Sequence, residues 1–259
     1  MAETQPTMPK PPSRFHFGFI PGVLFRPRRT FEQIHDVETA TWPTPMLALT
    51  LTGLIYVAVR GWLQTRAAMM GEVPLPADWQ WWTPEMQTQY MQAQAATQGP
   101  VFQYVIPALG MLAGLWIGWV VVGGLLHLAF TMLGGRGSTG SAMTLVAWAW
   151  LPVGVRDLLR VIYMLIVQRV IQSPGLAGFA PAGEGSGPLF LGALLGLLDL
   201  FVVWQVALMV IGARATEKLS PGKALAAVLA VVIVILLVQA GMGALVSSLG
   251  GLMITRPFF

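Results

Sequence analysis

The chain has 259 residues, of which 55% are hydrophobic and 10% are charged, and its formal net charge is +4. Soluble domains carry about 25% charged residues, so the composition excludes an ordinary soluble protein and indicates an integral membrane protein. There is no cysteine, which excludes disulfides and thiolate metal sites.

The polar, proline-bearing start of the chain predicts a short flexible cytoplasmic tail over residues 1–21 and no signal peptide. The next segment, LFRPRRTFEQI at 24–34, mixes basic and apolar residues. It predicts a short amphipathic helix lying in the membrane interface, with Phe25, Phe31 and Ile34 in the leaflet. The side chains predicted to meet anionic headgroups are Arg26, Arg28 and Arg29.

Long apolar runs follow, and each is about as long as, or longer than, the ~20 residues that cross a hydrocarbon core. They predict an all-α fold, a bundle of five transmembrane helices within a membrane domain of residues 22–250. Residues 251–259 are predicted to form a short external tail. The predicted spans are residues 46–64, 102–133, 141–169, 188–213 and 224–249.

The cations are distributed asymmetrically between the two sides of this five-span arrangement. Three lie on the side of the C-terminus (Arg66, Arg169 and Arg256), against nine on the side of the N-terminus. The positive-inside rule therefore places the N-terminus in the cytoplasm and the C-terminus outside. The nine are Lys10, Arg14, Arg26, Arg28, Arg29, Arg136, Arg214, Lys218 and Lys223.

Two loops are expected outside. Residues 67–100 contain Trp79, Trp81 and Trp82, whose amphipathic rings suit the headgroup level, with a buried contact to a partner protein as the alternative. Residues 172–187, rich in Gly, Pro and Ser, predict a flexible loop.

Ionisable residues inside the spans are the main candidates for function, because charges in hydrocarbon are costly. Counted from the cytoplasmic ends of their spans, Arg60, Arg156, Asp157 and Asp199 all lie about 21–24 Å deep, and Gln239 reaches the same level. The predicted polar layer comprises Arg60, Arg156, Asp157, Arg160, Asp199 and Gln239.

Three interpretations of this layer remain open. Opposite charges at one depth can form a structural lock that fixes helix register. Alternatively, Arg60 and Arg160 extend their long stems to the outer headgroups. The third interpretation is a proton or substrate pathway in which Asp157 and Asp199 titrate.

Other motifs favour packing over chemistry. His127 has no second ligand at helical spacing, so it is interpreted as a hydrogen-bonded packing residue, and GGRGSTG at 134–140 lacks the lysine of a phosphate loop and predicts a tight turn. No catalytic set, cofactor site, metal site or nucleic-acid partner is predicted. The glycines predicted to pack helices, or to dock a partner, are Gly110, Gly114, Gly118, Gly192 and Gly196.

Four segments together resemble the Yip1 domain family: the entry LFRPRRTFEQI, the turn GGRGSTG, the span opening SAMTLVAWAWLPVGV with Pro152, and WQVALMVIGARATEKLSPGKA at 204–224. The resemblance implies a five-span membrane domain. Eukaryotic members act in vesicle traffic between endoplasmic reticulum and Golgi and contact Rab GTPases through a long cytoplasmic region. The short region before the first span here resembles bacterial members more closely.

The sequence therefore predicts a non-enzymatic membrane scaffold or accessory subunit in a bacterial inner membrane. The alternative is a transporter or channel component that uses Arg60, Arg156, Asp157 and Asp199. The expected partners are anionic lipids on the cytoplasmic side and a membrane protein or a second copy of the chain.

Overall fold

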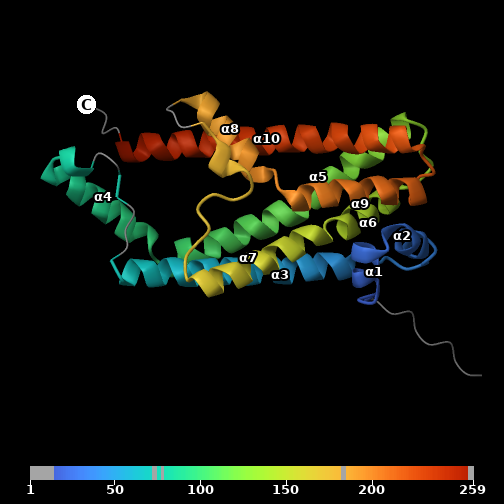
Figure 1. Ribbon diagram of the computed structural model, residues 1–259, viewed down its shortest axis with the longest axis horizontal. Coiled ribbons are helices and arrows are strands. Elements are labelled where there is room, and N and C mark those ends of the chain that lie inside the picture. Colours follow the sequence, from blue (N-terminus) through green and yellow to red (C-terminus); the bar gives the residue numbers. More distant parts are fainter. Residues whose placement is uncertain (1–14, 72–74, 77–78, 182–184, 256–259) are drawn as a thin grey trace, which may run out of the picture.

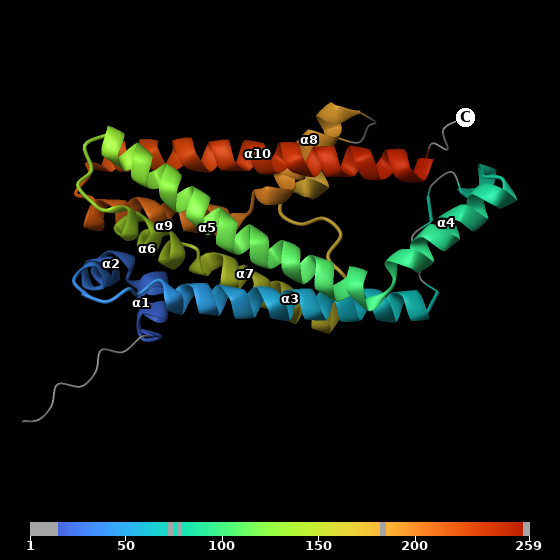
Figure 2. The same cartoon turned by 180° about the vertical axis from the view of Figure 1, so that it is seen from behind.

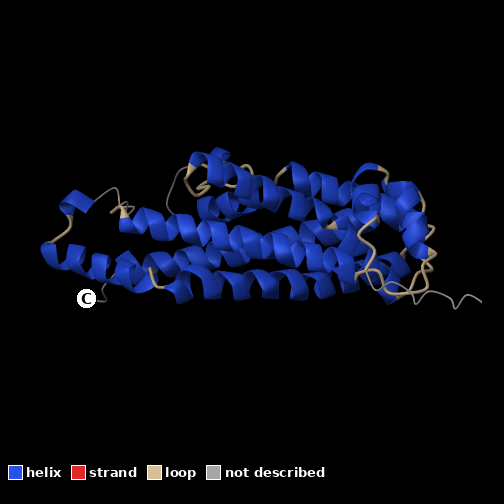
Figure 3. Ribbon diagram, turned by 90° about the horizontal axis from the view of Figure 1, so that it is seen from below, coloured by secondary structure: helices blue, strands red, loops and turns tan. Residues whose placement is uncertain are grey.

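The computed structural model describes residues 15–71, 75–76, 79–181 and 185–255, so parts of both predicted tails lie outside it. All regular secondary structure in these residues is helical (Figure 3), and the long helices run side by side in one elongated bundle (Figure 1). The elements are α1 (Phe19–Phe25), α2 (Pro27–His35), α3 (Pro43–Met69), η1 (Trp79–Trp81), α4 (Pro84–Thr97), η2 (Val101–Val105), α5 (Ile106–Met132), α6 (Thr139–Ala149), α7 (Leu151–Val167), η3 (Ala177–Phe179), α8 (Ser186–Leu197), α9 (Leu200–Thr216) and α10 (Pro221–Thr255).

Three helices in the described residues are long and apolar enough to cross a membrane: Pro43–Met69, Val101–Met132 and Pro221–Ser248. They correspond to the first, second and fifth predicted spans. The fourth predicted span is broken, because α8 and α9 meet at an angle of 62°. Counting this bent pair as one span gives up to four candidates.

The third predicted span, residues 141–169, is not one helix. It consists of α6, with 11 residues, and α7, with 17 residues, which are separated at Trp150. Pro152 lies at the start of α7, where its missing N–H leaves no intrahelical hydrogen bond unmade. Each piece is shorter than the ~20 residues of a typical span, which explains why neither qualifies alone.

The bundle brings distant segments together. α3 packs along α7, α5 packs along α6, and α10 contacts α5, α8 and α9. In Figures 1 and 2, α3 and α10 lie on opposite sides of the bundle, α1 and α2 cover one end, and α4 lies at the other end. Most core residues come from the half of the bundle near α1 and α2, where α2 also packs on α9.

Trp148, on α6, is the largest of the fully buried side chains. Its indole Nε1 donates a hydrogen bond of 3.1 Å to Thr41 Oγ1, which satisfies the one polar group of a buried ring. Trp119 Nε1 similarly donates to the carbonyl of Met143 at 2.8 Å. These tryptophans therefore fix α5 and α6 within the core by packing and by one directed bond each.

The opening segment corrects one expectation. Residues 27–35 are helical, but Phe31 and Ile34 are 1% and 5% exposed and belong to the protein core. Phe31 lies against Gly212 of α9, where an added Cβ would collide with Leu145 and press on the ring of Phe31 at 3.2 Å. Only Phe25, 78% exposed, remains free to enter a leaflet. The apolar face of an amphipathic helix must be covered by another apolar surface. For α2 that surface is mainly α9.

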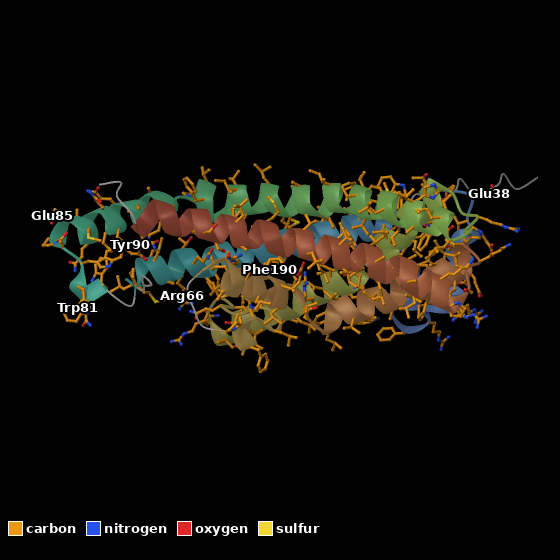
Figure 4. All side chains as sticks on the ribbon, turned by 90° about the horizontal axis from the view of Figure 1, so that it is seen from above. Glu38, Arg66, Trp81, Glu85, Tyr90 and Phe190 are labelled. Atoms are coloured by element: carbon orange, nitrogen blue, oxygen red, sulfur yellow. The ribbon has the colours of Figure 1, made fainter. Side chains whose placement is uncertain are left out.

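The predicted outer loop contains a helix, α4, and an aromatic cluster at its base. Trp79, Trp82 and Tyr90 pack in tilted and edge-to-face contacts with ring centroids 5.5–5.6 Å apart, whereas Trp81 is 80% exposed. Figure 4 places Trp81, Glu85 and Tyr90 at the end of the bundle opposite Glu38. The tryptophans thus divide into two that pack against α4 and one that faces outward.

The predicted packing glycines behave differently on the two helices. A Cβ built at Gly110 or Gly114 of α5 meets nothing within 4 Å, so these two residues do not form a close helix contact. Gly192 and Gly196 of α8 instead lie against residues 174–180. A Cβ built at either glycine would lie 3.7 Å from the Cβ of Ala180 or Ala177, respectively. The closest helix approaches occur at other glycines, namely Gly53, Gly61, Gly123 and Gly212.

Candidate functional site

A cluster of four charged side chains is the most distinctive polar feature within the bundle. Arg156 and Arg160 are four residues apart on α7 and therefore share one face, with Asp157 beside them. Arg156 Nε lies 3.5 Å from Asp157 Oδ1. Asp199, from the junction of α8 and α9, completes the cluster. Each side chain keeps only 12–21% of its surface exposed, so the charges neutralise one another away from bulk water.

Asp199 links two arginines and also begins a helix. Its Oδ2 lies 3.5 Å from both Arg156 Nη1 and Arg160 Nη2. Its Oδ1 accepts a hydrogen bond of 3.0 Å from the backbone N–H of Val202, which makes it the N-cap of α9. Its negative charge also favours the positive end of the helix dipole. One carboxylate therefore holds the helix break and connects it to α7.

The loop before α8 packs against this break. The backbone N–H of Leu176 donates to the carbonyl of Leu195 at 2.9 Å and of Leu198 at 3.2 Å, which satisfies acceptors at the end of α8. Gly175 has φ +58°, and a Cβ there would lie 2.7 Å from the Leu198 carbonyl oxygen. Glycine is thus required for this close approach, and residues 174–180 pack as part of the fold despite their loop-like composition.

Arg60 does not join the cluster. It lies on an exposed face of α3 and takes part in none of the ion pairs of the described residues. Of the residues predicted to share one layer, the structure brings Arg156, Asp157, Arg160 and Asp199 together and leaves Arg60 apart. Gln239, on α10, lines a cavity of about 450 Å³ together with Arg156 and Asp157.

A second polar connection, at the α1–α2 end, was missed by the sequence reasoning. Glu217 is 1% exposed and accepts a hydrogen bond of 2.7 Å from the backbone N–H of Gly137. Lys223 Nζ donates to the carbonyl of Leu133 at 2.8 Å. These bonds join the α5–α6 turn to the α9–α10 turn. The turn GGRGSTG connects α5 and α6, as predicted. No pattern in the sequence indicated that Glu217, at the end of α9, would be buried against it.

His127 departs from its predicted surroundings. Nδ1 of His127 is buried without a hydrogen-bond partner, so the predicted hydrogen bond is not found at that atom. Within the described part of the chain, no group of three or more His, Asp or Glu side chains has metal-site geometry.

The capping role of Asp199 could have been found in the sequence, because Asp immediately before the apolar run LFVVW is a typical helix N-cap.

The sequence matches a known protein family over most of its length. Residues 22–242 match the Yip1 domain, a range that contains the charged cluster, both broken helices and the connection between the two turns. Neither the curated proteins nor the solved structures include a match to the chain. The apolar helices and this match identify a membrane protein, and the chain belongs to the Yip1 domain family.

Proposed function

We propose that the protein is a non-enzymatic membrane scaffold or accessory subunit of a membrane complex. The observation that carries the proposal is the pairing within the charged cluster. Asp199 is engaged by Arg156, Arg160 and the N–H of Val202 at once. A carboxylate held in this way acts as a structural lock between α7 and the α8–α9 break, and a rigid bundle with exposed apolar helices is suited to holding partners.

Copurification of the full chain in mild detergent, followed by mass spectrometry, tests this function. We expect a stoichiometric membrane-protein partner or a second copy of the chain. The test variant is Asp199→Asn, which loosens the α7 junction and should lower the partner's recovery. Arg60→Gln, outside the cluster, is the matched control. A monomeric, partner-free protein whose reconstitution produces an Asp199-dependent ion flux would contradict the scaffold proposal.

A transport component is the second candidate, and one observation favours it. Arg156 and Asp157, both in the charged cluster, also line the cavity of about 450 Å³. An ion or proton that entered this space would meet ionisable groups inside the bundle. Flux measurements on proteoliposomes containing Asp157→Asn separate the two candidates, because a structural role changes stability without creating or abolishing flux.

We further propose five membrane crossings with the N-terminus in the cytoplasm, in which α6–α7 and α8–α9 are interrupted spans. Support comes from the gathering of basic segments at one end. Arg26 in the α1–α2 connection, Arg214 at the end of α9 and Lys223 at the start of α10 lie there, whereas Arg66 bonds to Gln168 toward the α4 end (Figure 1).

Single cysteines test this topology cleanly, because the natural chain has none. Phe179→Cys, at a position that is 82% exposed, should react with a membrane-impermeant maleimide in intact cells. Ser220→Cys, in the α9–α10 turn, should react only after permeabilisation. The cysteine-free parent is the control. Reaction of both variants from the same side would contradict five crossings with this orientation.

We also propose that Phe25 and its neighbouring arginines bind the cytoplasmic headgroups. Arg26, Arg28 and Arg29 are exposed, and Arg28 forms an exposed ion pair of 3.4 Å with Glu32. Replacing the three arginines by glutamine should reduce the stabilisation that anionic nanodiscs give over zwitterionic ones by about 3 kcal/mol, which is ~1 kcal/mol for each arginine. Thermal unfolding in both lipids measures it. Equal loss in both lipids would contradict an electrostatic contribution.

A further inference from the structure

The cavity beside the charged cluster has a predominantly apolar wall. It measures about 450 Å³, within the range of sites that hold small molecules. Six helices contribute to it, with Leu49 from α3, Met111 from α5, Val153 from α7, Leu197 from α8, Val206 from α9 and Ile235 from α10. A space of this kind inside a membrane bundle favours an apolar occupant over water.

Two glycines keep the wall of α5 open. Gly114 and Gly118 line the cavity one turn apart. A Cβ at Gly114 meets no atom within 4 Å, and one at Gly118 meets only the ring of Trp150, at 3.4 Å. These glycines therefore do not serve a close helix contact. Their effect is to leave room along α5 for a molecule lying in the cavity.

Two amide side chains in the lining can donate hydrogen bonds to an occupant. Gln205 of α9 and Gln239 of α10 both line the cavity, and neither side chain takes part in a hydrogen bond within the described residues. Trp150 Nε1 and Arg156 Nε are also without a hydrogen-bond partner, but both atoms are closed off from the cavity surface and do not reach an occupant. An occupant that offers acceptor oxygens would pair the two amides.

The charges of the cluster indicate the head that this occupant carries. Arg156 and Arg160 are balanced by Asp157 and Asp199, so the cluster has no surplus positive charge for a phosphate. Moving a phosphate into this layer would therefore cost its desolvation without a free counter-charge. An uncharged head with carbonyl oxygens has no such cost.

We propose that this cavity binds an uncharged diacyl lipid of the diacylglycerol class. An acyl chain packs along Gly114 and Gly118, and ester carbonyl oxygens accept hydrogen bonds from the side-chain amides of Gln205 and Gln239. This binding site goes beyond the scaffold function and does not depend on it. A bound lipid would fill the space between α3, α5 and α10 and complete the polar groups of the lining.

Photolabelling of the full chain in phosphatidylcholine nanodiscs tests the site. The probe is diacylglycerol with a diazirine in one acyl chain, and labelled peptides are located by mass spectrometry. We expect labelling of α5 and α10 around the cavity. Gly114→Leu should reduce it about tenfold, the loss expected when roughly two methylene groups can no longer be buried. Gly110→Leu is the matched control, because its Cβ is equally free but Gly110 does not line the cavity.

Three further comparisons make the outcome decisive. Equal labelling of Gly114→Leu and Gly110→Leu, with equal thermal stability, would overturn the site. A phosphatidylglycerol probe with the same chain that labels as strongly would overturn the uncharged head. If Gly114→Leu does not fold, competition on the natural chain replaces it: unlabelled dioleoylglycerol should suppress cavity labelling, and unchanged labelling would overturn the proposal.

Discussion

Asp199→Asn is expected to lower the free energy of unfolding of the full chain by about 2–4 kcal/mol. Removing one partner of a buried ion pair costs roughly 3–5 kcal/mol, and the 12–21% exposure of these side chains reduces that figure somewhat. Asparagine keeps an oxygen that can cap α9 but loses the charge that Arg156 and Arg160 share. Thermal or denaturant unfolding in a mild detergent measures the loss.

A compensating change distinguishes a lock from a general loss of structure. Arg160 has its only described ion pair with Asp199, so adding Arg160→Gln to Asp199→Asn removes the unpaired guanidinium and should recover part of the stability. Arg60→Gln is the matched control, since Arg60 is exposed and outside the cluster, and should change stability by less than about 0.5 kcal/mol. Undiminished stability of Asp199→Asn would exclude the lock.

Counting residues along the spans could group charged side chains by level but could not say which of them meet. Rise per residue placed Arg156, Asp157 and Asp199 at one level, and the structure brings these three together. The same arithmetic failed for Arg60 because depth does not say which side of a helix faces the bundle. By helical spacing Arg60, seven residues after the buried Gly53, stands near the same face of α3, yet it is exposed, so its exposure could not be read from the periodicity.

The helix breaks illustrate a different limit of the sequence. Apolar composition is continuous across residues 188–213, and composition alone therefore predicts an uninterrupted span. The interruption depends on one local preference, the capping of α9 by Asp199, and on a distant one, the insertion of Gly175 against the end of α8. The first can be read from the sequence, but the second requires the tertiary structure, because residues 174–176 must first be brought to the break.

The opening helix shows why an apolar face does not identify its environment. Phe31 and Ile34 stand on one face of α2, and such a face is buried as effectively by protein as by lipid. The face of α2 is buried by protein because Gly212 of α9 leaves space for the ring of Phe31 beside Leu145. That complementarity involves residues about 180 positions apart. No local pattern in LFRPRRTFEQI contains it.

Phe31→Ala should therefore destabilise the chain by about 3–5 kcal/mol, the usual cost of removing a buried aromatic ring and leaving a cavity. Phe31 is 1% exposed, whereas Phe25, six residues earlier, is 78% exposed, so Phe25→Ala is the matched control and should leave the free energy of unfolding nearly unchanged. Unfolding in detergent measures both variants. If α2 were instead inserted in the membrane through Phe31, the two substitutions would have similarly small effects on unfolding, and Phe31→Ala would mainly weaken contact with lipid. A large loss confined to Phe31 requires that α2 be held by α9, with its arginines exposed at the surface.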